Sequence, residues 1–242
     1  MSNILDILRE QKEMRLKGNI YHITQVNFAY NTNHIEGSTL TEEQTRYIYE
    51  TNTLVLEDGN DKANVDDIIE TANHFKLVDY MLDVADKELT ADMIKEFHKI
   101  LKTGTSDERK SWFNVGEYKK LENEVAGQAT TKPADVESAM ETLLNKYNSL
   151  STVTFEDIVK FHKDFETIHP FQDGNGRVGR IIMFKECLKN NITPFIILDK
   201  DKMYYYRGLK EYDTEKGYLV DTCLNAQDQY QALVNKYIGD LL

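Results

Sequence analysis

Apolar residues recur at helical spacing through most of this chain. A short amphipathic segment begins at Ile4, a second helix is expected from Gly18 into the 31–33 region, and a longer apolar stripe follows over residues 65–84. Residues three and four apart share one face of a helix, so these stripes predict helices that each bury one side. The pattern as a whole predicts a mainly α-helical protein.

Polar residues at the ends of these stripes predict where several helices begin. Thr41, Thr90 and Thr154 each precede an amphipathic run, and acidic residues follow in the first turn. A threonine in this position can accept a hydrogen bond from a free backbone N–H of the first turn. Pro133 predicts a further start, because proline suits the first position of a helix. The region after residue 191 is expected to add two more helices.

Residues 103–132 interrupt the helical pattern. Glycines and alternating polar and apolar residues predict an extended flap or hairpin within residues 112–131. The residues expected in its strands are Tyr118, Lys119, Lys120, Gln128, Ala129 and Thr130. The chain is therefore expected to be an all-α helical bundle with one small β-hairpin. It would comprise an N-terminal helical extension over residues 1–60 and a core domain over residues 61–242.

The composition narrows the possible functions. The net charge is −12, from 41 acidic and 29 basic residues, which argues against a general nucleic-acid-binding protein because such proteins need a basic surface. No apolar run is long enough to span a bilayer, and no signal peptide is visible. Cys187 and Cys223 lie in apolar surroundings, which predicts buried free thiols. A cytoplasmic protein without nucleic-acid or membrane partners is expected.

One polar segment contrasts with the helical pattern around it. Residues 169–180 read His-Pro-Phe-Gln-Asp-Gly-Asn-Gly-Arg-Val-Gly-Arg. Gly174 and Gly176 flank Asn175, so the backbone can turn sharply and direct several N–H groups to one point. The helix expected after them adds the free N–H groups of its first turn. This segment is therefore expected to bind nucleotide phosphates.

Charged side chains of the same segment supply the other groups that phosphate chemistry needs. Arg177 and Arg180 lie three apart on one helix face, and guanidinium groups donate hydrogen bonds to phosphate oxygens in pairs. Asp173 offers a hard oxygen ligand for Mg²⁺. His169 is a base whose ordinary pKa lies near neutrality. Each residue alone has a structural explanation, but the ordered set predicts a catalytic site.

Residues 169–180 resemble the motif of the Fic family, His-Pro-Phe-x-Asp/Glu-Gly-Asn-Gly-Arg-x-x-Arg, at every fixed position. The segment 161–168 is also similar to the family's helix before the motif, and the likeness extends from Trp112 to residues 206–209. The resemblance implies an all-α bundle with a β-hairpin flap. It also implies transfer of AMP from ATP, with Mg²⁺, to a Tyr, Ser or Thr hydroxyl of a protein.

The resemblance implies a role for each position of the motif. His169 would deprotonate the target hydroxyl, and Asp173 would hold Mg²⁺ between the α- and β-phosphates. Arg177 would bind the β-phosphate and Arg180 the γ-phosphate. Phe171 is expected to anchor the loop in the core. The residues expected to cradle the α- and β-phosphates are Gly174, Asn175, whose side chain would also reach them, and Gly176.

Further features of the family refine the expected reaction. Relatives similar to Doc, which phosphorylate their targets, carry Lys in place of Gly174, and phosphocholine-transferring relatives carry Ala, so Gly174 indicates AMP transfer. The run 204–206 resembles the tyrosine segment beside the adenine, and Tyr205 is expected to line that pocket, although Gly208 replaces the usual alanine. The flap is expected to align the target by strand addition.

A segment before the core is similar to the family's inhibitory pattern, Ser/Thr-x-x-x-Glu-Gly/Asn. Its fixed residues are Thr32, Glu36 and Gly37. The resemblance implies that Glu36 pairs with Arg180 and so misplaces ATP. From spacing alone, Thr32 and Glu36 are also an ordinary helix pair, and Gly37 is an ordinary helix end.

The sequence leaves three functions open. The first is an auto-inhibited protein AMP-transferase that acts on an unidentified protein or on itself. The second is a phosphodiesterase that removes AMP from a modified protein, with Glu36 activating water. The third is a non-catalytic nucleotide-binding regulator, which the intact His169 and Asp173 disfavour. Homo-oligomers are common among relatives, so self-association is a further expectation.

Overall fold

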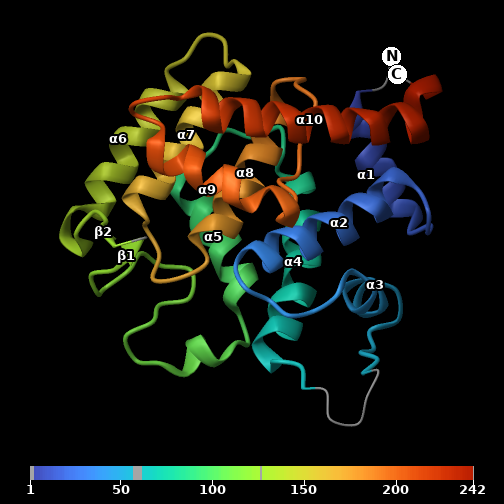
Figure 1. Ribbon diagram of the computed structural model, residues 1–242, viewed down its shortest axis with the longest axis horizontal. Helices are drawn as coiled ribbons and strands as arrows, with labels where there is room; N and C mark the ends of the chain where they lie inside the picture. The colour runs from blue at the N-terminus through green and yellow to red at the C-terminus, as the bar shows by residue number, and fades with distance from the viewer. Residues whose placement is uncertain (1–2, 57–61, 126, 242) are drawn as a thin grey trace.

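Ten α-helices make up most of the computed structural model, which describes residues 3–56, 62–125 and 127–241 (Figure 1). In chain order they are α1 (Ile4–Met14), α2 (Ile20–Ile35), α3 (Glu42–Thr51), α4 (Val65–Asp83), α5 (Ala91–Lys102), α6 (Val136–Asn148), α7 (Phe155–Ile168), α8 (Asn175–Lys189), α9 (Lys202–Glu211) and α10 (Gly217–Ile238). Short 3₁₀ helices join some of them: η1 (Ser106–Arg109), η2 (Pro133–Asp135), η3 (Asp199–Asp201) and η4 (Gly239–Leu241). The prediction of a mainly helical protein is confirmed.

The helix starts predicted from threonine are confirmed. Thr41 accepts a hydrogen bond from the Gln44 N–H, while the Gln44 side chain accepts one from the Thr41 N–H. Thr154 and Asp157 form the same reciprocal pair at the start of α7, and Thr90 caps α5 with its own side chain. These bonds satisfy backbone donors that have no partner inside the helix. Polar residues at the ends of apolar stripes thus mark the starts of α3, α5 and α7 correctly.

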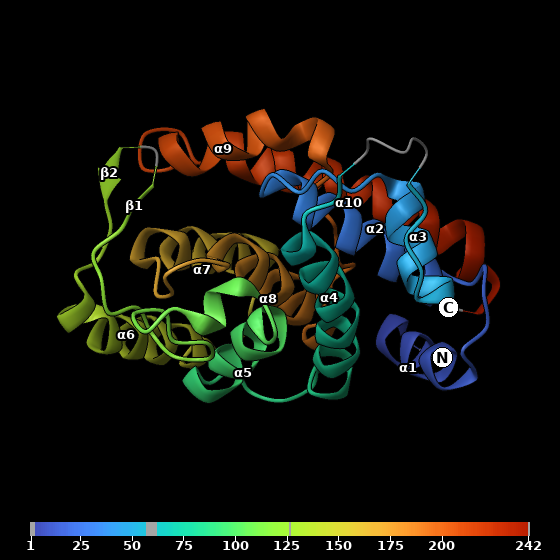
Figure 2. The same ribbon diagram turned by 90° about the horizontal axis from the view of Figure 1, so that it is seen from below.

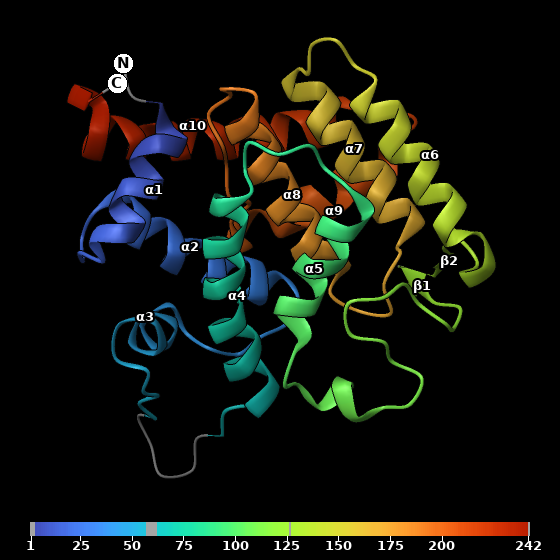
Figure 3. The same cartoon turned by 180° about the vertical axis from the view of Figure 1, so that it is seen from behind.

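Helix α8 lies at the centre of the bundle, where α2, α4, α5 and α7 pack around it (Figure 3). Residues 178–188 of this helix are all buried. A helix buried on every side needs apolar or paired polar residues all round. Ile181 and Phe184 accordingly join the main hydrophobic cluster, while Lys185 and Glu186 pair with each other at 2.6 Å. The start of α8 is therefore held in place by four neighbouring helices.

The N-terminal helices share this core. Phe28 of α2 and Phe184 of α8 lie 5.2 Å apart between ring centroids. The hydroxyls of Thr24 and Tyr230, 2.8 Å apart, join α2 to α10, and both chain ends lie at the same end of the molecule (Figure 1). The division into an extension over residues 1–60 and a core over residues 61–242 stays a prediction. What the packing shows is that α2 lies directly beside α8.

A short pair of strands lies in the region where a flap was expected. The strands β1 (Glu124–Val125) and β2 (Gln128–Ala129) pair antiparallel, at one end of the molecule (Figure 2). Gln128 and Ala129 therefore fall in a strand as predicted, whereas Thr130, expected in the same strand, lies just after it. A pairing of two residues on each side does not by itself establish a docking flap, so that function stays a prediction.

The expected first strand at Tyr118, Lys119 and Lys120 is wrong. Lys119 is buried, and its ammonium donates hydrogen bonds to Asn123 Oδ1 and Thr130 Oγ1, each at 2.6 Å. A buried ammonium must bond to several oxygens to offset its lost hydration. These bonds hold the Lys119 side chain in the interior, and strand pairing occurs at residues 124–125 instead.

Two expectations from composition can also be compared with the structure. Cys187 and Cys223 are both buried and free, as predicted. Among the helices of residues 3–56, 62–125 and 127–241, none has the length and apolar character to cross a membrane.

Candidate active site

The loop between α7 and α8 is a sharp connection set by its backbone conformation. Helix α7 ends at His169, whose φ of 52° and ψ of 61° are left-handed, and Pro170 follows. Gly174 precedes α8 with a φ of 82°, a value that glycine adopts without steric penalty. The Lys119 N–H donates to Pro170 O at 2.8 Å and holds the first half of the loop. The loop therefore presents His169 and the start of α8 to the same region.

The second half of the loop is held by Asn175. Its side-chain oxygen accepts from the Phe171 N–H at 2.8 Å, and its amide donates to Phe171 O at 2.9 Å. Phe171 is fully buried and stacks on His98 with ring centroids 4.0 Å apart, so its expected role as a core anchor is confirmed. His98 accepts from the Gly116 N–H at Nδ1, which leaves Nε2 to donate to Asp173 O at 3.1 Å. His98 thereby holds the backbone of Asp173 in place.

His169 is a neutral imidazole at physiological pH. Its side chain is 17% exposed, and burial together with the charge of Lys119 lowers its pKa to about 4. Its Nδ1 has no hydrogen-bond partner among the described residues and lies 3.8 Å from Glu166 Oε2. Burial and the nearby Glu36 raise the pKa of Glu166 to about 8. A neutral imidazole has one unprotonated ring nitrogen, which can accept a proton from a hydroxyl group.

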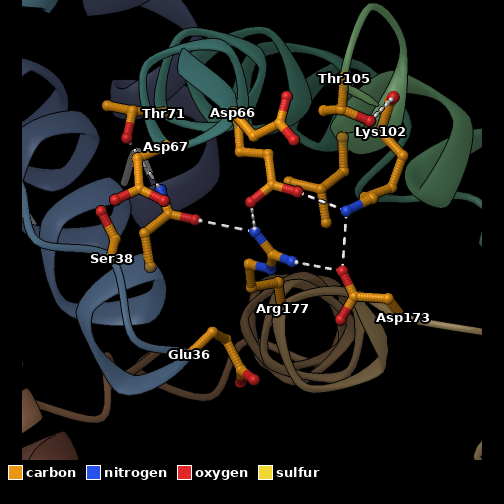
Figure 4. A network of polar contacts seen from close by, with 12 residues as sticks. Glu36, Ser38, Asp66, Asp67, Thr71, Lys102, Thr105, Asp173 and Arg177 are labelled. Atoms are coloured by element: carbon orange, nitrogen blue, oxygen red, sulfur yellow. Dashed lines mark hydrogen bonds and ion pairs between the residues drawn. The ribbon is translucent and has the colours of Figure 1, made fainter. Parts of the chain in front are cut away.

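Asp173 lies in a cluster of charged side chains at the start of α8, most of which are largely buried. Its Oδ2 contacts Lys102 Nζ at 2.7 Å and Arg177 Nη2 at 3.2 Å (Figure 4). Lys102 also pairs with Glu70 at 2.5 Å and Asp107 at 2.6 Å, and Arg177 also pairs with Glu70. Burial alone would raise the pKa of Asp173, but Arg177 and Lys102 hold it well below its ordinary value. Asp173 therefore stays ionised.

The carboxylates of this cluster suit a divalent cation only at Asp173. Oxygens of Glu70, Asp107 and Asp173 lie within 4.8 Å of one another, but the Lys102 ammonium already contacts all three. The Asp173 side chain is 51% exposed, and both of its cationic partners contact Oδ2. Mg²⁺ is commonly held by one or two carboxylates together with substrate phosphates. Asp173 fits this description from its exposed side.

Arg180 is held by the end of α2. Its Nε donates to Thr32 Oγ1 at 2.7 Å, and its Nη2 donates to Thr32 O at 3.2 Å and to Glu36 Oε1 at 2.5 Å. The Glu36 carboxylate also lies against Gly176, where a side chain would collide with it. Glu36 thus contacts both the buried guanidinium of Arg180 and the first turn of α8. These are the two groups that would attract a phosphate.

Comparison with known proteins shows a family likeness for part of this chain. Residues 88–187 match the sequence profile of the Fic/DOC family. Protein adenylyltransferase Fic of Drosophila ananassae is 32% identical over 184 residues, which cover 75% of this chain and 35% of that protein. The chain contains a Fic/DOC family domain. A protein of the same name from Nematostella vectensis is 28% identical over 187 residues, 75% of this chain and 42% of that protein, so the chain spans well under half of the length of these relatives.

Solved structures show the same fold. A Fic domain-containing signaling protein from Bacteroides thetaiotaomicron superposes with a TM-score of 0.71 and 25% identity, over 96% of this chain and 90% of that one. Fic-1 from C. elegans superposes with a TM-score of 0.70 and 21% identity, over 98% and 70%. The fold is therefore the mostly helical Fic type.

The structure brings most of the expected site residues together. His169, Asp173, Arg177 and Arg180 surround the start of α8, and Glu36 reaches Arg180 from α2. Both polar atoms of the Asn175 side chain bond to the Phe171 backbone, and its expected contact with phosphates stays a prediction. A small amide between two glycines can close a loop as readily as face a ligand.

Tyr205 has surroundings that differ from those expected of an adenine pocket. It is 1% exposed, and its hydroxyl lies 2.6 Å from His162 Nε2 and 3.5 Å from Arg180 Nη1. Its neighbours Tyr204 and Tyr206 are the exposed members of the run. Tyr205 therefore supports Arg180 in the Fic/DOC domain and does not line an open pocket in this conformation.

Sequence reasoning missed three residues of this site. Glu70 and Lys102 complete the charge cluster, and His98 holds the backbone of Asp173. In the sequence, Glu70 and Lys102 cannot be distinguished from ordinary polar residues of amphipathic helices. His98 follows Phe97 on α5, and only its complete burial, which no local pattern predicts, distinguishes it.

Proposed function

We propose that this chain is an auto-inhibited protein AMP-transferase, which moves AMP from ATP to a Tyr, Ser or Thr hydroxyl of a target protein or of itself. The observation that carries the proposal is the position of Glu36. Its carboxylate lies on Arg180 and against Gly176, where the first turn of α8 would otherwise receive a phosphate. The names of the relatives support the same reaction.

The residues around the start of α8 suit this transfer. Neutral His169 would take the proton of the target hydroxyl, whose oxygen attacks the α-phosphorus. The bond from that phosphorus to the bridging oxygen breaks, and pyrophosphate leaves. Arg177 and Arg180 would hold the β- and γ-phosphates, and backbone N–H groups of residues 174–176 would face the α-phosphate. Mg²⁺ bound at Asp173 would supply further neutralisation of phosphate charge.

Glu36 would restrain this reaction by occupying Arg180. A γ-phosphate and a carboxylate cannot use the same guanidinium donors at once, so bound ATP would lie out of line for attack. Orientation is a large part of catalysis in reactions that transfer phosphorus groups. The contact therefore needs to hold ATP only slightly away from its productive pose.

The experiment is intact-mass analysis after incubation with Mg²⁺-ATP. Glu36→Gly is expected to gain the mass of AMP on itself or on an added target, while the wild-type chain gains much less. Glu43→Gly, at an exposed position of α3, is the matched control and should behave as the wild-type chain does. Equal labelling of Glu36→Gly and wild type would disprove the restraint. Addition of phosphate in place of AMP would disprove the reaction.

One observation also favours hydrolysis of AMP-modified protein. The Glu36 side chain is 29% exposed beside the start of α8, where it could accept a proton from an attacking water. The measurement is release of AMP from a modified protein. Wild type should release it and Glu36→Gln should not, and nucleotide binding without either reaction would instead indicate a regulator.

A further inference from the structure

Arg177, like Arg180, is already held by a carboxylate from outside the loop. Its Nη1 donates to Glu70 of α4 and, at 3.4 Å, to Asn33 Oδ1. Its Nη2 donates to Asp173 at 3.2 Å. The side chains of Arg177 and Glu70 are 4% and 12% exposed. A β-phosphate that binds Arg177 must therefore replace a partner that is already in place.

The charges of the cluster around Arg177 are balanced without a phosphate. Three carboxylates, those of Glu70, Asp107 and Asp173, face three cations, because Lys110 contacts Asp107 at 2.5 Å in addition to Lys102 and Arg177. Charges a few ångströms apart interact strongly where water is largely excluded. Removing the charge of Glu70 would leave the cluster with a net charge of +1, which favours an anion beside Arg177.

Helix α4, which carries Glu70, also contacts the segment that carries Glu36. Asp67, one turn before Glu70, accepts a hydrogen bond from the Thr39 N–H at 3.0 Å. Thr71 accepts one from Asn33 of α2 at 3.4 Å. Residues three and four apart share a helix face, so α4 contacts the α2 end and the catalytic loop with one surface (Figure 4). Both carboxylates also lie before residues 88–187, the part that matches the family profile.

We infer that Glu70 is a second internal competitor, which holds Arg177 until a β-phosphate replaces its carboxylate. The inference rests on the proposed function, in which Arg177 receives the β-phosphate and Arg180 the γ-phosphate. ATP must then displace two carboxylates from α8, Glu36 at one arginine and Glu70 at the other. ADP has a β-phosphate and competes with Glu70 for Arg177, whereas AMP has no phosphate for either arginine.

The three nucleotides separate the two contacts. Dissociation constants of AMP, ADP and ATP are measured by calorimetry on the full chain at one fixed Mg²⁺ concentration. Glu70→Gln keeps the shape of the side chain and an oxygen that can accept from Lys102. It is expected to bind ADP and ATP about tenfold more tightly and AMP unchanged. Glu36→Gly is expected to strengthen ATP binding more than ADP binding, because only ATP has a phosphate for Arg180.

The control variant is Glu42→Gln, which removes the same charge from an exposed pair with Arg46 and should change none of the three constants. Weaker or unchanged ADP binding in Glu70→Gln would overturn the inference and make Glu70 a positioning group for Arg177. Thermal unfolding without nucleotide checks the fold of each variant. If Glu70→Gln does not fold, Glu70→Asp withdraws the charge by one methylene and should give a smaller gain for ADP. Unchanged ADP binding in that variant would equally overturn the inference.

The outcome is independent of AMP transfer, because ADP binding requires neither a target nor a reaction. Failure of Glu36→Gly to label would reject the proposed function and leave the ADP result intact. Failure of Glu70→Gln to bind ADP more tightly would reject the role of Glu70 and leave labelling by Glu36→Gly intact.

Discussion

Arg177 and Arg180 lie one turn apart on α8, yet their carboxylate partners are held very differently. Glu36 follows the last residue of α2 and precedes Gly37, whose φ is +98°, and its side chain is 29% exposed. Glu70 lies within α4 and is 12% exposed. The end of a helix can open locally at little free-energy cost, whereas its interior opens only with its neighbours. The Arg180 contact is therefore suited to release by a local change.

The neighbours of the two arginines differ as well. Apart from Glu36, the partners of Arg180 are the neutral Thr32 and Tyr205. Arg177 shares Asp173 with Lys102, so it keeps a carboxylate when Glu70 is withdrawn. Loss of Glu36 leaves a buried cation without a counter-charge, which is costly until an anion arrives. The Arg180 contact is thus a single ion pair, whereas the Arg177 contact is one part of a charge network.

The largest expected effect concerns His169, the proposed proton acceptor. His169→Ala in the Glu36→Gly background should lower AMP transfer by about 10²–10⁴, because the target hydroxyl loses its proton acceptor. ATP binding should change little, since His169 makes no ion pair with Arg177 or Arg180 among the described residues. Transfer is followed by labelled ATP and binding by calorimetry. Transfer that persists at the parent rate would remove His169 from this role.

Removing Lys102, the central cation of the charge network, should destabilise the fold. Lys102→Met leaves three carboxylates within 4.8 Å of one another and should lower the free energy of unfolding by about 3–5 kcal/mol. Urea unfolding measures the change. Lys160→Met, which breaks an exposed pair with Asp164, is the control and should cost less than about 1 kcal/mol. Equal costs would show that the network contributes no more than a surface pair.

Both arginine contacts depend on the loop that precedes α8. Asn175→Ala removes two hydrogen bonds to the buried Phe171 backbone and should lower the free energy of unfolding by about 1–3 kcal/mol. Asn190→Ala loses one bond, at 2.8 Å to Glu186 O, and should cost about 1 kcal/mol. Chemical unfolding compares the two variants. A cost for Asn175→Ala no greater than that for Asn190→Ala would mean that the loop is held chiefly by Phe171.

The smallest expected effect is that of pH on the Glu36→Gly enzyme. The pKa of His169 is lowered to about 4, so the imidazole is neutral at all higher pH values and the rate falls only as pH falls toward 4. Transfer should change by less than about twofold between pH 6 and 8. An ordinary histidine would be only about a quarter neutral at pH 6 and would give a roughly fourfold loss. A loss of that size would contradict the buried, neutral state of His169.

Local features of this fold could be predicted from the sequence. Thr41, Thr90 and Thr154 cap helices because a cap involves residues three apart, and the glycines around Asn175 mark a turn for the same reason. The site loop was predicted because its groups lie within twelve consecutive positions. Glu36 and Arg180 are 144 residues apart, and only resemblance to the family connected them.

What could not be predicted depends on burial and on contacts across the chain. Glu70 and Arg177 are 107 residues apart, and nothing in the α4 stripe distinguishes Glu70 from a solvated acid. The role of Asn175 and the inward position of Lys119 follow from which polar atoms are shielded from water. The shielding of a polar atom from water depends on which elements pack against it. Periodicity predicts which face of a helix is buried, but it does not predict what that face packs against.

The order in which Glu36 and Arg180 occur has a consequence for the newly made chain. Glu36 leaves the ribosome 144 residues before Arg180, which at ordinary elongation rates is roughly 7–30 s earlier. Helix α2 and its carboxylate are therefore already available when the arginine emerges. When the loop at residues 169–180 forms in the nascent chain, Glu36 would therefore already be available to contact Arg180.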